Sequence, residues 1–291
     1  MSDSLSDCKS ILGRRFRTGR FHFRSVFVNG ILKGIGYMRI VTYNLRCDVK
    51  EDGVNSFTNR KGFVIDKIET AKPDVIGFQE VTPPMNAYLR DKLSSYTLVG
   101  CGRGADYQDE HNPIAFLKDK YELIALDVTW LSPTPYEPGS RFENQSICPR
   151  IITHAILRPI QAGEPFHVYN THTDHVSSLA RQMAAQRLLD KIKADQETHP
   201  FPVLVTGDFN AQPETKEITM ITEKLIDLTQ NVGTTFHSFG SLDGGQIDYV
   251  FSSGFEKEKE AVKWTDELNR VFLSDHYPIE ISVKRKDGGA V

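Results

Sequence analysis

The segment Pro202-Val203-Leu204-Val205-Thr206-Gly207-Asp208-Phe209-Asn210 combines an apolar run with a polar turn. A short apolar run that ends in such a turn is typical of a buried β-strand. At its end, a carboxylate and a carboxamide stand two residues apart, and in an extended backbone such residues point to the same side. We therefore expect Asp208 and Asn210 to face one point in space, and Phe209 to turn into the core.

The composition of the chain is that of an ordinary globular protein. It has 291 residues, of which 39% are apolar and 25% are charged. Because there is no run of eighteen apolar residues, we expect no transmembrane helix. The cysteines are widely spaced and form no Cys-x-x-Cys motif, which favours reduced thiols in an intracellular protein over a disulfide framework or a zinc site. They are Cys8, Cys47, Cys101 and Cys148.

Charge is distributed unevenly between residues 1–37 and the rest of the chain. The first 37 residues carry seven basic and two acidic side chains, a net charge of +5, whereas the remainder carries −8 of the total of −3. This segment has no apolar stretch of the kind that a secretory signal needs. An Arg-rich transit peptide, a basic arm that recruits RNA or an anionic membrane, and an upstream extension all fit it. We favour a poorly ordered, non-catalytic extension.

The rest of the chain alternates strand and helix patterns. We expect helices near 59–70, 85–95, 177–194 and 213–225, and a long loop at 131–149. The expected strands lie at 38–46, 74–80, 112–117, 121–130, 150–157, 166–172, 202–208, 246–251 and 279–283. The segments 112–117 and 121–130 are interpreted as a β pair. Interleaved elements of this kind predict one α/β domain with two packed sheets flanked by helices.

Polar side chains stand at the ends or edges of these strands, where loops on a rigid sheet can converge on one point. Carboxylates and amides are ligands for Mg²⁺ or Mn²⁺, and histidines can act as acid, base or phosphate-binding groups. Each motif alone is more typical of a solvated turn or a capped loop, and His154, His167, His175 and His199 keep that interpretation. The ordered set favours an active site and consists of Asn44, Glu80, His172, Asp208, Asn210, Asp248, Asp275 and His276.

As an ordered set, short phrases across residues 38–283 resemble the endonuclease/exonuclease/phosphatase superfamily of metal-dependent phosphoesterases. They are Val41-Thr-Tyr-Asn44, Gly77-Phe-Gln-Glu80, Asn170-Thr-His172, Gly207-Asp-Phe-Asn210, Ile247-Asp-Tyr249 and Ser274-Asp-His276. Further phrases are similar to compact bacterial hydrolases related to carbon catabolite repressor deadenylases, namely Trp130-Leu-Ser-Pro-Thr-Pro135, Pro149-Arg150 and Thr171-His-Thr-Asp-His175. At the position of His154 those relatives tend to carry Trp. This difference bears on the substrate contacts expected near Arg150 and leaves the central chemistry unchanged.

The resemblance implies a four-layer α/β sandwich, with two packed mixed β-sheets flanked by helices. It places the catalytic domain at residues 38–285, after the basic extension 1–37 and before a flexible tail at 286–291. It also implies a catalytic Mg²⁺ or Mn²⁺ bound by Glu80, with Asn44 and Asp275 close by.

The resemblance further assigns roles at the reacting phosphate. His276 pairs with Asp248, and the pair of His276 and Asp208 activates the attacking water. Asn210 and His172 bind the phosphate oxygens. Arg150 is a candidate phosphate clamp, for which a structural arginine is the alternative.

The function expected on this basis is metal-dependent hydrolysis of a phosphodiester, with single-stranded nucleic acid or a small phosphodiester as the favoured substrate. The acidic body argues against wrapping duplex DNA. Alternatives are a phosphomonoesterase that acts on a phosphorylated inositol or sugar, and a non-catalytic binding protein on the same fold. The protein is expected to be a cytoplasmic monomer, with organellar targeting by residues 1–37 left open.

Overall fold

A computed structural model describes residues 37–161 and 163–286. The predicted basic extension, apart from Tyr37, and the predicted tail, apart from Lys286, lie outside the described residues. The proposed domain boundaries therefore stay predictions. Within the described residues, no helix is both long enough and apolar enough to cross a membrane.

The first sheet has the strand order β11-β15-β1-β2-β4-β3, and β12 also pairs with β15. Its central strands β1 and β2 are parallel, whereas β1 and β15 are antiparallel, so the sheet is mixed. The strands are β1 (Met38–Asn44), β2 (Val75–Gln79), β3 (Tyr96–Val99), β4 (Ile114–Leu117), β11 (Phe255–Lys257), β12 (Val262–Lys263) and β15 (Ile279–Arg285).

The second sheet has the order β5-β6-β7-β8-β10-β9 and is also mixed, because β7 and β8 are parallel and their neighbours are antiparallel. A separate small hairpin pairs β13 (Glu267–Leu268) with β14 (Val271–Phe272). The strands of the second sheet are β5 (Tyr121–Trp130), β6 (Ile151–Pro159), β7 (Phe166–His172), β8 (Val203–Asp208), β9 (Ile226–Asp227) and β10 (Asp248–Ser253).

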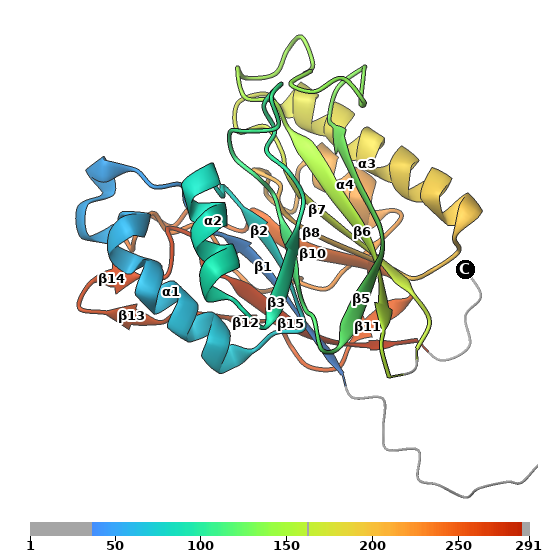
Figure 1. The fold of residues 1–291 in the computed structure, drawn as a ribbon. Helices are drawn as coiled ribbons and strands as arrows, with labels where there is room; N and C mark the ends of the chain where they lie inside the picture. Colours follow the sequence, from blue (N-terminus) through green and yellow to red (C-terminus); the bar gives the residue numbers. More distant parts are fainter. Residues whose placement is uncertain (1–36, 162, 287–291) are drawn as a thin grey trace, which may run out of the picture. The chain divides into compact units, whose positions relative to one another are not determined.

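Helices cover the outer faces of the two sheets (Figure 1). Helices α1 (Phe57–Ala71) and α2 (Pro83–Lys92) pack on the first sheet, and α3 (Ser178–Thr198) and α4 (Lys216–Thr222) pack on the second. A 3-10 turn, η1 (Lys50–Asn55), precedes α1. A third apolar cluster lies between the sheets and combines residues of both, such as Ile40 and Val168. This arrangement confirms the expected four-layer sandwich.

Beneath the strand ends that carry the polar residues, the two sheets meet through hydrogen bonds instead of apolar side chains. Gln79 of β2 donates to the Asn170 side-chain oxygen of β7 at 2.7 Å, and Thr206 of β8 donates to the same oxygen at 3.0 Å. Gly77 permits this close approach, because a Cβ there would lie 2.0 Å from the Thr206 hydroxyl. These polar contacts join the carboxyl end of β2 in the first sheet to those of β7 and β8 in the second.

Two expectations about the elements are wrong. Segments 112–117 and 121–130 do not pair with each other, because β4 pairs with β2 and β3 in the first sheet whereas β5 pairs with β6 in the second. The short turn between them crosses from one sheet to the other. The helix expected at 213–225 is confined to α4, and the short strands β3, β9 and β11 to β14 were not expected.

Candidate active site

A cavity of about 430 Å³ opens where the polar strand ends meet. Most of the residues predicted for the site line it, namely Glu80, Arg150, His172, Asp208, Asn210, Asp275 and His276. The other two, Asn44 and Asp248, are buried directly behind it and contact the lining carboxylates and His276. The structure therefore brings together residues that are up to 232 positions apart in the chain.

Glu80 stands at the first position after β2 and turns into the cavity through a left-handed backbone, with φ of 60°. A non-glycine residue in this region is uncommon, and such strain is concentrated at functional sites. Its carboxylate accepts hydrogen bonds from the Asn44 side chain at 3.0 Å and from the Cys47 backbone at 3.1 Å. Burial alone would raise the pKa of Glu80. The Asn44 hydrogen bond and the charge of His276, with smaller effects of Cys47 and Arg46, outweigh burial and bring this pKa below its usual value, so the carboxylate is ionised.

Asn44 links two carboxylates. Its amide nitrogen donates to Glu80 at 3.0 Å and to Asp208 at 2.9 Å, while its oxygen accepts from the Arg46 backbone at 2.9 Å. Asn44 was predicted among the metal ligands; here its amide nitrogen faces the two carboxylates and its oxygen faces the Arg46 backbone. In this conformation, Asn44 positions Glu80 and Asp208.

Asp275 lies on the same side of the cavity as Glu80. Its carboxylate is 3.7 Å from the Arg46 guanidinium and accepts a hydrogen bond from Ser274 at 3.1 Å. Burial raises the pKa of Asp275, and the nearby charge of Glu80 adds to this effect. A carboxylate whose pKa is raised by burial and by a neighbouring carboxylate is one that a cation would stabilise in its ionised form.

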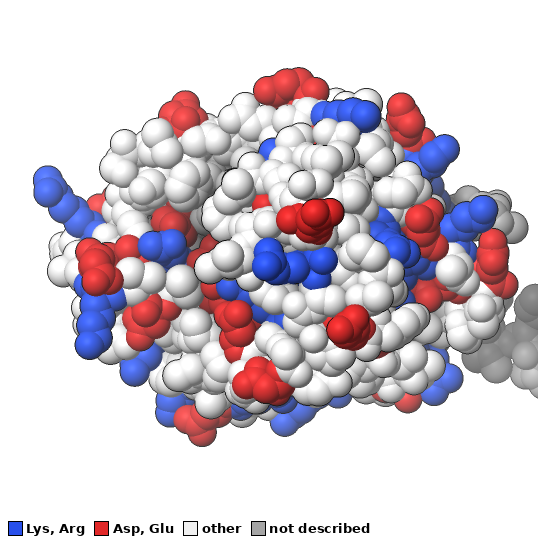
Figure 2. All heavy atoms as spheres, turned by 90° about the horizontal axis from the view of Figure 1, so that it is seen from above, with Lys and Arg blue, Asp and Glu red and all other residues white. Residues whose placement is uncertain are grey.

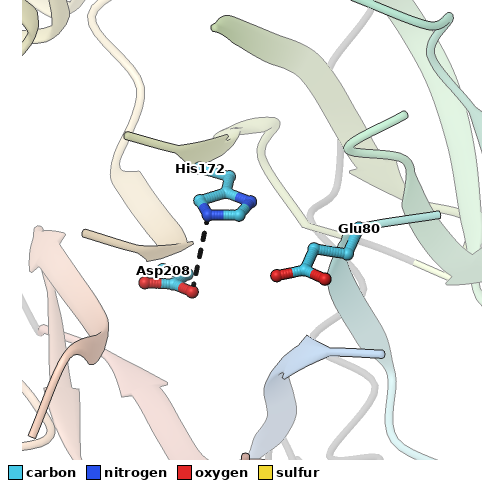
Figure 3. Close-up of side chains that lie close together, drawn as sticks. All are labelled: Glu80, His172 and Asp208. Carbon is cyan, nitrogen blue, oxygen red and sulfur yellow. Dashed lines mark ion pairs between the residues drawn. The ribbon is translucent and has the colours of Figure 1, made fainter. Parts of the chain in front are cut away.

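Asp208, Asn210 and His172 form the opposite wall, and Figure 3 shows Asp208 and His172 facing Glu80 across the site. The His172 Nε2 atom lies 3.0 Å from the Asn210 amide nitrogen and 3.6 Å from the Asp208 carboxylate. Phe209 packs in the core, as expected. Asp208 and Asn210 do converge, but not as an extended strand: β8 ends at Asp208, and Asn210 has φ of 47°.

His276 completes this wall. Its Nδ1 atom is 2.8 Å from Asp248, which also accepts from the Thr235 hydroxyl at 2.7 Å, and its Nε2 atom is 3.8 Å from Asp208. Burial lowers the pKa of His276, but the charge and hydrogen bond of Asp248, together with the charges of Asp208 and Asp275, outweigh burial and raise this pKa to about 10. Burial and the charge of Asp248 raise the pKa of Asp208 to about 7. Asp208 and His276 can therefore share a proton through a water molecule held between them.

Several cavity residues were not expected from the sequence. Arg46, Arg103, Glu110 and Phe236 come from loops without a recognisable motif. His175 was interpreted as a structural residue, but it lines the cavity and contacts Arg150 at 3.0 Å. Its position inside the phrase Thr171-His-Thr-Asp-His175 was the one signal that could have identified it.

The structural interpretation holds for two other histidines. His154 and His167 are buried, hydrogen-bond each other at 2.9 Å and do not line the cavity. His154 also stacks on Tyr169, with ring centroids 4.3 Å apart. Its position therefore does not affect contacts beside Arg150.

The residues present fit a divalent cation. One ligand atom from each of Glu80, His172 and Asp208 lies within 4.8 Å of the others, and Asp208, Asp248 and His276 form a second such group. A buried oxygen of Asp248 has no hydrogen-bond partner. Carboxylate-rich sites of this kind suit hard cations, which are bound by oxygen ligands.

Comparison with known proteins agrees with this geometry. The sequence profile described as the Endonuclease/Exonuclease/phosphatase family matches residues 41–276. The crystal structure of an endonuclease/exonuclease/phosphatase from Bacteroides vulgatus is 30% identical, with a TM-score of 0.80 over 86% of this chain and 99% of that chain.

Two more distant solved structures share the fold. A mannosyl-6-phosphatase from Bacteroides thetaiotaomicron is 24% identical, with a TM-score of 0.78 over 85% of this chain and 99% of that one. TDP2 from D. rerio, complexed with a single-strand DNA product, is 17% identical, with a TM-score of 0.67 over 85% of this chain and 99% of that one.

The fold and the site define a phosphoesterase hydrolase of the α/β-sandwich class. The chain belongs to the Endonuclease/Exonuclease/phosphatase family, which confirms the resemblance seen in its motifs.

Proposed function

We propose that this protein is a Mg²⁺- or Mn²⁺-dependent hydrolase in which an activated water attacks a phosphodiester. The observation that carries the proposal is the position of Asp208. Its carboxylate lies 2.9 Å from Asn44, 3.6 Å from His172 and 3.8 Å from His276. Asp208 therefore connects the side of the cavity that carries Glu80, through Asn44, with the side that carries the two histidines.

Glu80 and Asp275 would hold the cation, with Asn44 setting the direction of the Glu80 carboxylate. When bound, the cation would polarise a phosphoryl oxygen and neutralise the charge that develops on it. Asn44 acts on both walls at once, because its single amide nitrogen donates to Glu80 and Asp208.

Asp208 and His276 form the water-activating pair. Their facing atoms are 3.8 Å apart, too far for a direct hydrogen bond and close enough for both to contact one water molecule. Asp248 fixes His276 through its Nδ1 atom, which leaves Nε2 directed at Asp208. The proton that leaves the water is assigned to this pair as a unit.

His172 and Asn210 bind the phosphate oxygens. Burial and the charge of Arg150 lower the pKa of His172 well below its usual range, so the ring is neutral. The Asn210 amide nitrogen, at 3.0 Å from the His172 Nε2 atom and at 3.2 Å from the Thr173 carbonyl, fixes the orientation of the ring, whose buried Nδ1 atom has no partner and can donate to an anion. Arg150 lines the same cavity and is assigned to the substrate as well.

A single-stranded nucleic acid or a small phosphodiester is the favoured substrate. Acidic and basic side chains are interspersed on the face in Figure 2 and form no continuous basic stripe of the kind that tracks duplex DNA. The D. rerio relative was solved with a single-strand DNA product. Phosphomonoester hydrolysis is the second candidate, because another relative is a mannosyl-6-phosphatase. A monomeric, cytoplasmic enzyme remains part of the proposal.

The test is hydrolysis of bis-p-nitrophenyl phosphate and of p-nitrophenyl phosphate by the full-length protein. We expect turnover with Mg²⁺ or Mn²⁺, loss of turnover in EDTA, and a decrease of at least about 10³-fold in both Asp208→Asn and His276→Ala. The exposed residues Asp91 and His199 provide the matched controls Asp91→Asn and His199→Ala. Near-normal turnover in both active-site variants would overturn the assignment, and turnover that survives EDTA would contradict the role of Glu80. A folded protein that binds phosphoesters without turnover would favour the non-catalytic alternative.

A further inference from the structure

The cavity has a second end that the proposed hydrolysis does not explain. Arg103, Arg150 and His175 line it, and together we call them the arginine end. The carboxylates Glu80, Asp208 and Asp275 line the same cavity, and a fourth, Glu110, lies beside Arg103. The cavity therefore combines carboxylates that suit a cation with a cluster of basic side chains that suits an anion.

Arg150 is buried but incompletely bonded. Arg150 is only 4% exposed. Its one side-chain hydrogen bond joins Nη2 to the His175 ring at 3.0 Å. The Nε and Nη1 atoms have no partner. Among the described residues, no carboxylate oxygen lies within 4.0 Å of this guanidinium. A buried charge without a counter-charge is strongly unfavourable, which indicates that an anion belongs there.

Arg103 differs, because its charge is already compensated. It is 7% exposed and lies 2.8 Å from Glu110 and 3.3 Å from Asp109. Its loop is tightly packed, because a Cβ at the neighbouring Gly102 would lie 2.2 Å from the Gln108 carbonyl. Burial and then the charge of Arg103 lower the pKa of Arg150, and the opposing charges of Glu110 and Asp208 offset this only in part. Arg103 is thus held by its own carboxylates, and Arg150 is the arginine whose donors are left for an anion.

The anion at the arginine end is not the one that is attacked. In the proposed function the scissile phosphate lies beside Asp208 and His276, on the wall of the cavity that also carries His172 and Asn210. Arg150 bonds to none of these groups. A cavity of about 430 Å³ is within the size range that accommodates a whole small ligand, so it has room beyond one phosphoryl group.

We propose that the arginine end binds a second phosphoryl group of the substrate, with Arg150 as its main ligand and His175 and Arg103 in support. The preferred substrate is then a phosphoester that carries another phosphate nearby, such as a diester next to a terminal phosphate. Guanidinium matches phosphate through paired hydrogen bonds, and the two free nitrogens of Arg150 are suitable donors. The identity of the scissile group rests on the proposed function, whereas the anion site does not.

The first experiment measures binding of inorganic phosphate to metal-free, full-length protein by calorimetry in EDTA. Without a cation the carboxylates repel phosphate, so binding reports the arginine end. We expect one site, weakened at least 10-fold in Arg150→Gln and partly retained in Arg150→Lys. Asn210→Ala should keep it. The matched control is Arg158→Gln, which removes an exposed arginine from the far end of β6. Phosphate binding that Arg150→Gln leaves unchanged would overturn the proposal. Arg150→Lys keeps the test valid if the glutamine variant fails to fold.

The second experiment compares kcat/KM for dithymidylate with and without a terminal phosphate, in Mg²⁺. We expect the terminal phosphate to raise kcat/KM at least 10-fold in the natural protein, and Arg150→Gln to remove that advantage. An equal loss on both substrates would assign Arg150 to the scissile phosphate and would refute a second site. If neither dinucleotide is hydrolysed while phosphate still binds through Arg150, the proposed diester chemistry fails and the anion site stands.

Discussion

Two buried arginines, Arg60 and Arg150, show opposite solutions to the same problem. Arg60 of α1 is fully buried and donates to the backbone carbonyls of Asn55 at 2.8 Å and Leu273 at 2.6 Å, and also to those of Leu45 and Arg46. Arg150 is almost as buried and keeps two nitrogens without partners. Burial alone does not distinguish a structural cation from a ligand-binding one; the inventory of its hydrogen bonds does.

The carbonyls that Arg60 binds belong to the segments that carry the cation side of the site. Leu45 and Arg46 follow Asn44, and Leu273 precedes Asp275 by two residues. The Tyr43 hydroxyl also donates to the Leu273 carbonyl, at 3.0 Å. Arg60 therefore positions residues of the active site without reaching the cavity, whereas Arg150 faces the cavity directly.

The largest expected effect follows from Arg60→Met. The substitution leaves several buried carbonyls without donors, each of which costs about 1–3 kcal/mol, so we expect a loss of at least about 3 kcal/mol in the free energy of unfolding. Denaturant titration at equilibrium measures this. Arg60→Lys should restore part of the loss, because an ammonium can satisfy some of the carbonyls. A decrease below about 1 kcal/mol would contradict the structural role and weaken the comparison.

A second prediction concerns His154, a buried side chain that, unlike an arginine, can become neutral by losing a proton. Burial lowers the pKa of His154 from 6.5 to about 3, so the folded protein holds it neutral, whereas the unfolded chain protonates it near 6.5. Stability from this group is present above pH 6.5 and is lost as the pH falls from there toward 3. The slope is about 1.4 kcal/mol per pH unit for one proton.

His154→Phe should therefore make the unfolding free energy less dependent on pH between 6.5 and 5. The slope should decrease by about the contribution of one proton, which is about 1.4 kcal/mol per pH unit. Phenylalanine can keep the stack on Tyr169 and loses the bond to His167. Unfolding titrations at several pH values, with His199→Phe as an exposed control, measure the difference. An unchanged slope would mean that His154 is protonated in the folded protein.

The smallest expected effect is that of Arg150→Met on stability. Removing an unpaired buried charge relieves its desolvation cost, so we expect the free energy of unfolding to stay the same or rise by about 1 kcal/mol. Thermal and denaturant unfolding of the metal-free protein measure it. A loss as large as that of Arg60→Met would show that Arg150 is structural, and would remove the distinction between the two arginines.

Much of the fold followed from local patterns. The strand expected at 166–172 is β7, and the strand expected to end at Asp208 is β8. Ser177 and Ser178 were both possible caps of the helix that follows, and it is Ser177 that accepts a hydrogen bond from the Ala180 backbone at 3.2 Å. The prediction that β4 and β5 pair was wrong. A turn as short as those of hairpins connects them, but here it crosses from one sheet to the other. Which partner a strand chooses depends on long-range packing, and no local pattern records it.

The sequence by itself determined which polar residues stand at the ends of buried strands, because apolar runs and their polar ends are local features. That was sufficient for the family and for the set around Glu80, Asp208 and His276. Tertiary structure alone decided that Asn44 turns its nitrogen to the carboxylates, that Glu80 and Asn210 adopt left-handed backbones, and that Arg150 lacks a counter-charge. These properties depend on what lies across a cavity, where distance in space is unrelated to distance along the chain.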